Sequence, residues 1–222
     1  MSTPTRPRTV LFDIDGTLVD SNYLHVEAWQ HAFTELGVAT DAWRVHRAIG
    51  QDSERLVSAV AGDRETAWVE RAKRLHSGYY RDLAPRLRAF EATRDLLAAV
   101  AGRGIRVVLA TSAPDDELAV LLRTLDADAS IHATTSADDV GPAKPDPDII
   151  EVALQRAGAA SAEALFIGDS TWDMIASGRA GVRAYGLRSG GISAAELTDA
   201  GALAIFDDPG DLLAHLDAVL GD

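Results

Sequence analysis

The sequence predicts an α/β protein with a Rossmann-like parallel sheet, helices on both faces of the sheet and a small α-helical module inserted into the chain. Short β-rich apolar runs alternate with helix-like stretches, as in a chain of βα units. One long region interrupts this alternation with helical patterns only. The chain has 222 residues and is 47% hydrophobic, so it can bury one substantial core and a small second module.

The expected strands are short runs rich in apolar and β-branched residues. They cover 9–12, 105–110, 164–167, 182–187 and 203–206. Between them, the segments 91–102, 115–126, 146–157 and 172–179 have the length of crossover helices that join parallel strands. A last helix is expected to begin after Asp208, which can cap it, with Pro209 in its first turn.

The region 21–87 contains the helical patterns without a comparable strand. Its apolar residues follow helical spacing, for example Ala28, Trp29, Ala32 and Phe33. We therefore expect a Rossmann-like core of residues 1–20 and 88–222, and an inserted helical module of residues 21–87. Two connecting segments would join the module to the core.

Composition excludes several classes of function. The formal charge of −13, without a stripe of Lys and Arg, argues against binding nucleic acid. No apolar run reaches the roughly 18 residues of a membrane span, and the first residues lack the apolar stretch of a secretory signal, so we expect a cytoplasmic protein without a membrane partner. Without cysteine, any metal must be bound by oxygen or imidazole. A phosphate-binding site in so acidic a chain would also need a metal ion and local cations.

Two acidic residues, Asp13 and Asp15, directly follow the first expected strand. Ligands bind at the carboxyl ends of strands in open α/β sheets, so this position favours a functional site. An Asp followed by Gly16 and Thr17 also makes an ordinary turn. The dipeptide spacing alone leaves both explanations open.

The longer string, together with three later ones, resembles a known family. Asp13-Ile14-Asp15-Gly16-Thr17 resembles the first motif of the haloacid dehalogenase (HAD) superfamily, and the continuation to Ser21 is similar to its phosphoglycolate phosphatase and β-phosphoglucomutase-like branch. The segments 107–112, 144–147 and 168–173 look like the second, third and fourth motifs, in the family's order. The resemblance extends from about residue 9 to the end of the chain.

This resemblance implies a reaction at phosphate esters. Asp13 would attack phosphorus and form an aspartyl-phosphate, and Asp15 would protonate the leaving alcohol and later deprotonate water. Thr111, with the amide of Ser112 beside it, would donate to phosphoryl oxygens, and Lys144 would supply a fixed positive charge.

The resemblance also implies a Mg²⁺ ion. Its ligands would be Asp13, the backbone carbonyl of Asp15, and Asp169, while Asp173 would orient a water or Lys144. Each residue has a local explanation too. Asp169 and Asp173 could be an N-cap and a first-turn acid, Thr111 a β-branched residue ending a strand, and Lys144 a surface residue before proline.

The inserted module resembles the family's small helical cap, which closes over the site and reads the substrate beyond its phosphate. The candidate substrate-binding residues are Thr17 and Ser112 in the core and His25, Gln51 and Arg55 in the cap; Asn22 and Lys73 are weaker candidates, and a solvated polar face explains the polar cap residues equally well.

His25-Val26-Glu27-Ala28-Trp29 is similar to a stretch of β-phosphoglucomutases, although a histidine on an amphipathic helix is also simply partly buried. The later mutase signature is not matched, because Ile49-Gly50-Gln51-Asp52-Ser53 takes its place, and Pro114 and Asp115 follow the second motif instead of a lysine.

The predicted function is therefore a Mg²⁺-dependent phosphatase acting on a small phosphorylated metabolite such as phosphoglycolate or a sugar phosphate. A sugar-phosphate mutase is the main alternative. A phospho-acceptor signalling module is a third possibility, against which the position of Asp13 on the first strand and the helical insert argue. We expect a monomer or a weak dimer.

Overall fold

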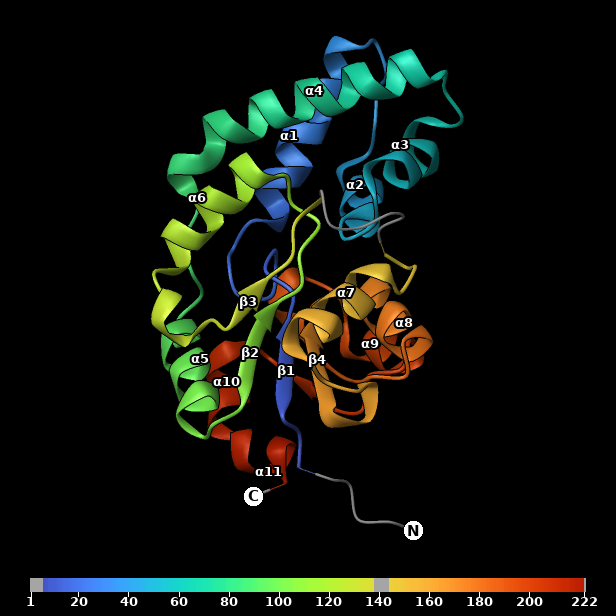
Figure 1. The fold of residues 1–222 in the computed structure, drawn as a ribbon. Coiled ribbons are helices and arrows are strands. Elements are labelled where there is room, and N and C mark those ends of the chain that lie inside the picture. Colours follow the sequence, from blue (N-terminus) through green and yellow to red (C-terminus); the bar gives the residue numbers. More distant parts are fainter. Residues whose placement is uncertain (1–5, 138–143, 222) are drawn as a thin grey trace. The chain divides into compact units, whose positions relative to one another are not determined.

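The computed structural model describes residues 6–137 and 144–221. Within them, one parallel sheet has the strand order β3-β2-β1-β4-β5-β6 (Figure 1). Its strands are β1 (Thr9–Phe12), β2 (Arg106–Leu109), β3 (Ala133–Thr134), β4 (Ala164–Gly168), β5 (Arg183–Leu187) and β6 (Ile205–Phe206). The five predicted strands are confirmed. The sequence analysis missed β3, because two residues make no recognisable apolar run.

The core helices are α5 (Thr93–Gly102), α6 (Asp115–Leu125), α7 (Asp148–Ala157), α8 (Thr171–Arg179), α9 (Ala194–Asp199), α10 (Pro209–Ala214) and α11 (Leu216–Leu220). The four predicted crossover helices are confirmed to within two residues at each end. Asp208 does cap α10, because its side chain accepts a hydrogen bond from the Asp211 N–H, and Pro209 is the first helical residue.

The last predicted helix is not continuous. Its apolar stripe consists of Leu212, Leu213, Leu216, Val219 and Leu220 and extends over two separate helices. At His215 the backbone adopts φ −110° and ψ 12°, outside the helical region, and divides the segment into α10 and α11. The His215 N–H donates to the carbonyl of Leu212, three residues back, which tightens the last turn of α10. The apolar stripe alone could not reveal this break, because it continues across it.

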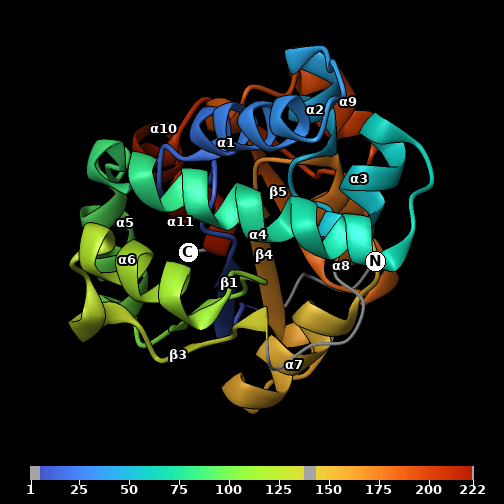
Figure 2. The same ribbon diagram turned by 90° about the horizontal axis from the view of Figure 1, so that it is seen from above.

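Helices cover both faces of the sheet. Leu11, Val108 and Phe166 lie on one face and belong to a single buried cluster with Ile149 of α7 and Met174 of α8. Figures 1 and 2 show α5 and α10 on the opposite side of the sheet from α7. The strands are therefore buried on both faces, which explains why they are almost continuously apolar.

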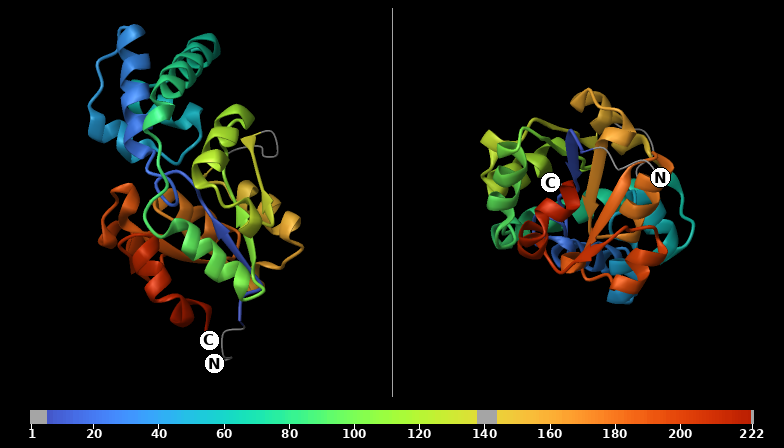
Figure 3. Two further views of the ribbon diagram at one scale, coloured as in Figure 1. Left: turned by 90° about the vertical axis from the view of Figure 1, so that its left-hand side faces the viewer. Right: turned by 90° about the horizontal axis from the view of Figure 1, so that it is seen from below.

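The strand order switches direction at the middle of the sheet, because β2 and β3 lie on one side of β1 and β4, β5 and β6 lie on the other. β1 pairs with β2 on one side and with β4 on the other. The right view of Figure 3 shows β1 in blue beside β4 in orange. Such a switch point leaves a crevice at the carboxyl ends of the neighbouring strands, where α/β proteins bind their ligands.

The residues Ser21–Leu87 form a second compact unit, separate from Met1–Asp20 and Arg88–Asp222. It consists of α1 (Asn22–Glu35), α2 (Ala42–Ala48), α3 (Ser53–Ala61), α4 (Thr66–Leu83) and a 3₁₀ turn (Ala84–Arg86). Helices α1 and α4 lie side by side. The unit has its own apolar core, built around Trp29, Phe33 and Val57.

The two chain segments that connect the units are bonded to each other on the core side. The Asp20 N–H donates to the carbonyl of Arg88 at 2.9 Å, and the two side chains form an ion pair at 2.7 Å. Val19 and Ala89 form an antiparallel bridge next to them. Both connections therefore leave the core at one place. Among residues 6–137 and 144–221, no helix has the length and apolar character that crossing a bilayer requires.

Candidate active site

Three strand ends bring the predicted motifs to one edge of the sheet. Phe12 of β1 lies in register with Leu109 of β2 and with Ile167 of β4. Sheet hydrogen bonding continues one residue further, since the Asp13 N–H donates to the Ile167 carbonyl at 2.9 Å. The side chains that follow these strands, including Asp13, Thr111 and Asp169, therefore lie at the same crevice.

Lys144 lies between two carboxylates. Its ammonium nitrogen is 2.6 Å from Oδ1 of Asp13 and 2.6 Å from Oδ1 of Asp173. The side chain of Lys144 is only 4% exposed, so the interpretation of this residue as an ordinary surface lysine is wrong. Burial alone would lower the pKa of Lys144, but the charges of Asp13 and Asp173 raise it above its usual range. Lys144 is thus a fixed cation at the site.

The electrostatics of Asp13 differ from those of an exposed carboxylate. Burial raises the pKa of Asp13, the Lys144 ammonium opposes this, and the negative charges of Asp173 and Asp15 add to it, so that the pKa of Asp13 is about 7. One lysine does not compensate the buried negative charge at this crevice. An additional cation would favour the ionised form of Asp13.

Asp173 contacts both Lys144 and the start of α8. Its Oδ2 accepts hydrogen bonds from the backbone N–H and the hydroxyl of Ser170, at 2.9 and 2.7 Å, while the Ser170 hydroxyl accepts from the Asp173 N–H. This is a capping box. The local explanation of Asp173 as a first-turn acid therefore holds together with its contact to Lys144. The N-cap is Ser170 and not Asp169.

Asp169 is oriented by Thr17. The Thr17 hydroxyl donates to Oδ1 of Asp169 at 3.0 Å, and Thr17 is fully buried. The Thr17 hydroxyl is thus directed to Asp169, and the expected contact between Thr17 and the substrate stays a prediction. Sequence reasoning had no signal for this pairing of residues 152 positions apart.

Asp13, Asp169 and Asp173 could hold a metal ion. Each offers a carboxylate oxygen, and the three oxygens lie within 4.8 Å of one another. Because both oxygens of Asp173 already contact Lys144 or Ser170, the arrangement favours Asp13 and Asp169 as ligands. Oxygen donors and uncompensated negative charge are what Mg²⁺ requires, so the residues present fit this ion.

Thr111 is fixed by a residue that the sequence analysis did not identify. The hydroxyl of Thr135 accepts from the Thr111 N–H at 3.0 Å and donates to the Thr111 carbonyl at 2.9 Å. The Thr111 hydroxyl accepts from the Ala113 N–H at 3.1 Å, so its own proton remains able to bond an oxyanion. Thr135 directly follows β3, and the polar string Thr134-Thr135-Ser136, which begins at the last residue of that short strand, was the available signal. Ser112, beside Thr111, is half-buried.

In the helical unit, His25 belongs to an aromatic cluster between α1 and α4. Its Nδ1 lies 3.1 Å from Nε2 of His76, and its ring stacks on Tyr80 with centroids 3.9 Å apart. The ring of His76 stacks on Trp29 at 4.3 Å. Burial lowers the pKa of His76 well below its ordinary value, and the charge of His25 adds to this effect. His25 is itself half-buried, as the local explanation expected.

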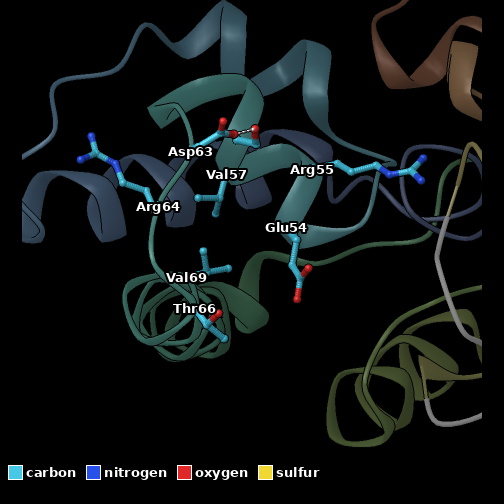
Figure 4. Close-up of a pocket in the computed structure, with 8 residues that line it drawn as sticks. Glu54, Arg55, Val57, Asp63, Arg64, Thr66 and Val69 are labelled. Atoms are coloured by element: carbon cyan, nitrogen blue, oxygen red, sulfur yellow. Dashed lines mark hydrogen bonds between the residues drawn. The ribbon is translucent and has the colours of Figure 1, made fainter.

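The other candidate residues of the helical unit lie around the start of α3. Arg55 forms an ion pair with Asp52 at 3.2 Å, and Gln51 is half-buried. Arg55 also lines a pocket of about 420 Å³ between α3 and α4, and Figure 4 shows its guanidinium extending away from Val57 and Val69. The complete lining is Glu54, Arg55, Val57, Ser58, Asp63, Arg64, Thr66 and Val69. Of the weaker candidates, Asn22 is buried and Lys73 pairs with Glu70.

Comparison with known proteins agrees with this geometry. A model of the haloacid dehalogenase-like hydrolase family matches residues 10–187. A phosphoglycolate phosphatase of Rhodospirillum rubrum is 32% identical over 212 residues, covering 91% of this chain and 88% of that protein. A phosphorylated carbohydrates phosphatase of Thermotoga maritima is 30% identical, with coverage of 95% and 99%. The crystal structure of a hydrolase from Pseudomonas syringae superimposes with a TM-score of 0.91 at 35% identity, covering 95% of this chain and 98% of that one.

Proposed function

Because this chain belongs to the haloacid dehalogenase-like hydrolase family, we propose that it is a Mg²⁺-dependent phosphatase that forms an aspartyl-phosphate on Asp13. The observation that carries the proposal is the buried Lys144, 2.6 Å from both Asp13 and Asp173 at the carboxyl edge of the sheet. The names of the relatives favour phosphoglycolate or a sugar phosphate as the substrate.

The reaction has two displacements at phosphorus. In the first, a carboxylate oxygen of Asp13 bonds to phosphorus while the bond to the alcohol oxygen breaks, and Asp15 gives that oxygen its proton. In the second, Asp15 takes a proton from water, whose oxygen bonds to phosphorus and breaks the bond to Asp13. Both carboxyl groups return to their starting states, and the products are the alcohol and inorganic phosphate.

Fixed donors would stabilise the charge on the transferring group. Lys144 is a permanent cation held by two carboxylates, and Thr111 is held at both its N–H and its carbonyl by Thr135. With the amide of Ser112, they would contact phosphoryl oxygens without rearranging during the reaction, which is the condition for effective electrostatic catalysis.

The metal ligands would be Asp13, the backbone carbonyl of Asp15, and Asp169. A bound Mg²⁺ ion would supply positive charge toward the phosphoryl oxygens. Thr17 would keep Asp169 in position through its hydrogen bond to Oδ1. Asp173 would act on Lys144 rather than on the ion.

We further propose that residues 21–87 act as a cap on a core formed by 1–20 and 88–222. The adjacent crossings at Asp20 and Arg88 support a hinge, because both chain segments leave the core at one place. In this proposal His25, Gln51 and Arg55 contact the part of the substrate beyond the phosphate. Closure would keep bulk water away from the aspartyl-phosphate. A cytoplasmic location and a monomeric or weakly dimeric state stay predictions.

The test is phosphate release from a panel of phosphomonoesters that includes phosphoglycolate and sugar phosphates. We expect release with Mg²⁺ and none with EDTA. Asp13→Asn should lower turnover by about 10⁴-fold or more, because it removes the nucleophile. The control is Asp217→Asn on α11, which alters an ion pair between the exposed Asp217 carboxylate and Arg103 at the end of α5. Substantial turnover by Asp13→Asn would exclude the nucleophile assignment.

A sugar-phosphate mutase is the second candidate, favoured by the string from His25 to Trp29. A mutase returns the phosphoryl group to another hydroxyl of the same sugar, so it produces little free phosphate. Conversion of β-glucose 1-phosphate to glucose 6-phosphate without net release of phosphate would support it over the hydrolase. The missing mutase signature at 49–53 makes the hydrolase the stronger proposal.

A further inference from the structure

We propose that the turn after β5, Arg188–Gly190, is a further part of the active site, in which Ser189 and Gly190 are positioning residues for the metal ligands. This inference rests on the proposed function. None of the four motifs includes these residues. The sheet brings them to the site, because β5 pairs with β4 up to Gly168 and Gly186, and both strands therefore end at the same crevice.

Ser189 forms a hydrogen bond with the turn that follows Asp13. Its hydroxyl donates to the carbonyl of Gly16 at 2.7 Å, and the Gly16 N–H donates to the carbonyl of Val19 at 2.9 Å. Gly16 is thus bonded at both of its backbone groups. It has φ +75°, a conformation that favours glycine.

The position of Gly16 determines the direction of the Asp15 carbonyl. In a planar trans peptide, the C=O of one residue and the N–H of the next point in opposite directions. Because the Gly16 N–H points to Val19, the Asp15 carbonyl points the other way. Ser189 therefore helps to aim the backbone oxygen that is proposed as a metal ligand.

Gly190 lies directly against Asp169. A Cβ atom at this position would lie 1.6 Å from Oδ2 of Asp169 and 2.4 Å from its Cγ. Gly190 does not have a positive φ, so the requirement for glycine here is steric rather than conformational. The Asp169 carboxylate is thus held between the backbone of Gly190 on one side and the hydroxyl of Thr17, which bonds Oδ1, on the other.

Two further contacts involve Arg188, the first residue of the turn. Arg188 forms an ion pair with Asp207 at 2.7 Å, and the Gly191 N–H donates to the Arg188 carbonyl at 2.9 Å. Residues that orient metal ligands in this way commonly change metal affinity about 10- to 100-fold when they are mutated. A substitution of Ser189 or Gly190 should therefore lower metal affinity.

The experiment measures Mn²⁺ binding by electron paramagnetic resonance, in the full chain and without substrate, with Mg²⁺ as competitor. Gly190→Ala should weaken Mn²⁺ binding about tenfold or more, because a methyl group occupies the space of the Asp169 carboxylate. Ser189→Ala should weaken it by a smaller factor. Ser189→Thr keeps the hydroxyl and should restore most of the affinity.

Two variants serve as matched controls. Gly178→Ala places a methyl group in open space on α8. Ser193→Ala removes the N-cap of α9, which should lower stability and leave Mn²⁺ affinity unchanged. If Gly190→Ala does not fold, the comparison of Ser189→Ala with Ser189→Thr decides the question.

The outcomes separate this inference from the proposed function. Wild-type Mn²⁺ affinity in folded Ser189→Ala and Gly190→Ala would overturn the positioning role and leave the metal site itself intact. An unmutated chain that binds no Mn²⁺ would overturn both the metal assignment and this inference. Weaker binding in the two variants, with unchanged binding in both controls, would support it.

Discussion

The ammonium nitrogen of Lys144 lies 2.6 Å from a carboxylate oxygen of Asp13, in a position where only 4% of the lysine side chain is exposed. Asp173 contacts the same nitrogen from α8. The three residues come from the end of β1, from the segment before α7 and from the first turn of α8. Lys144 therefore has a structural function in the resting protein besides any contact with the substrate.

Replacing this lysine should destabilise the metal-free protein. Lys144→Met keeps the apolar stem but leaves Asp13 and Asp173 buried without their cation, at a cost of about 3–5 kcal/mol in the free energy of unfolding. Urea unfolding in EDTA measures the effect. Lys73→Met is the control, because it breaks a solvent-exposed ion pair with Glu70 and should have little effect. Equal unfolding midpoints for the two variants would contradict the prediction.

Thr135 should matter for activity although it is fully buried behind Thr111. Thr135→Val keeps the shape but leaves the Thr111 N–H and carbonyl without their partner, at a cost of about 1–3 kcal/mol. The displaced Thr111 should also lower kcat for phosphate release. Thr135→Ser retains the hydroxyl and should keep both properties near those of the wild type. A Thr135→Val variant with normal kcat would show that the role of Thr111 in catalysis does not depend on its two hydrogen bonds with Thr135.

Thr17→Val should change the requirement for metal. The substitution removes the hydrogen bond to Oδ1 of Asp169 while keeping the volume of the side chain. We expect the Mg²⁺ concentration for half-maximal activity to rise about tenfold, with much of kcat recovered at saturating Mg²⁺. Thr17→Ser is the control that retains the donor. If Thr17 bound the substrate instead, the variant would raise KM for the phosphate ester without altering the Mg²⁺ dependence.

His76 should make the stability of the chain depend on pH. Its pKa in the fold is well below 6.5, mainly because of burial, whereas the unfolded chain takes up a proton near the ordinary value. The unfolded state therefore binds more protons, and the contribution of His76 is complete above about pH 6.5 and is lost as the pH falls below it. The slope for one proton is at most about 1.4 kcal/mol per pH unit.

Urea unfolding of the wild type and of His76→Gln between pH 7.5 and about pH 5 tests this linkage. The difference in unfolding free energy between the two proteins should change over this range, with the wild type losing more stability toward acid. His31→Gln, at an exposed position on α1, should keep the wild-type profile. Parallel curves for the wild type and His76→Gln would refute the assignment of this pH dependence to His76.

The strands and crossover helices could be predicted because their signals are local. Residues 164–167 are apolar throughout, and 9–12 are apolar except for the β-branched Thr9, as expected for strands buried on both faces. Asp208-Pro209 marks a helix start by its own chemistry. β3 and α9 were missed because two and six residues carry too little periodicity. The break at His215 was missed because the apolar stripe continues through it.

The sequence by itself determined that Asp13, Thr111 and Asp169 follow strands, since the position of a residue relative to a strand end is local. The tertiary structure alone decided what those residues touch. Thr17 bonds Asp169, and Thr135 bonds the backbone of Thr111. Ser189 bonds the carbonyl of Gly16, and Gly190 lies against Asp169. These partners depend on which strands are neighbours in the sheet and on how far each turn extends beyond its strand. The order of the strands in the sheet results from packing the whole core, so it cannot be inferred from any short stretch of the sequence.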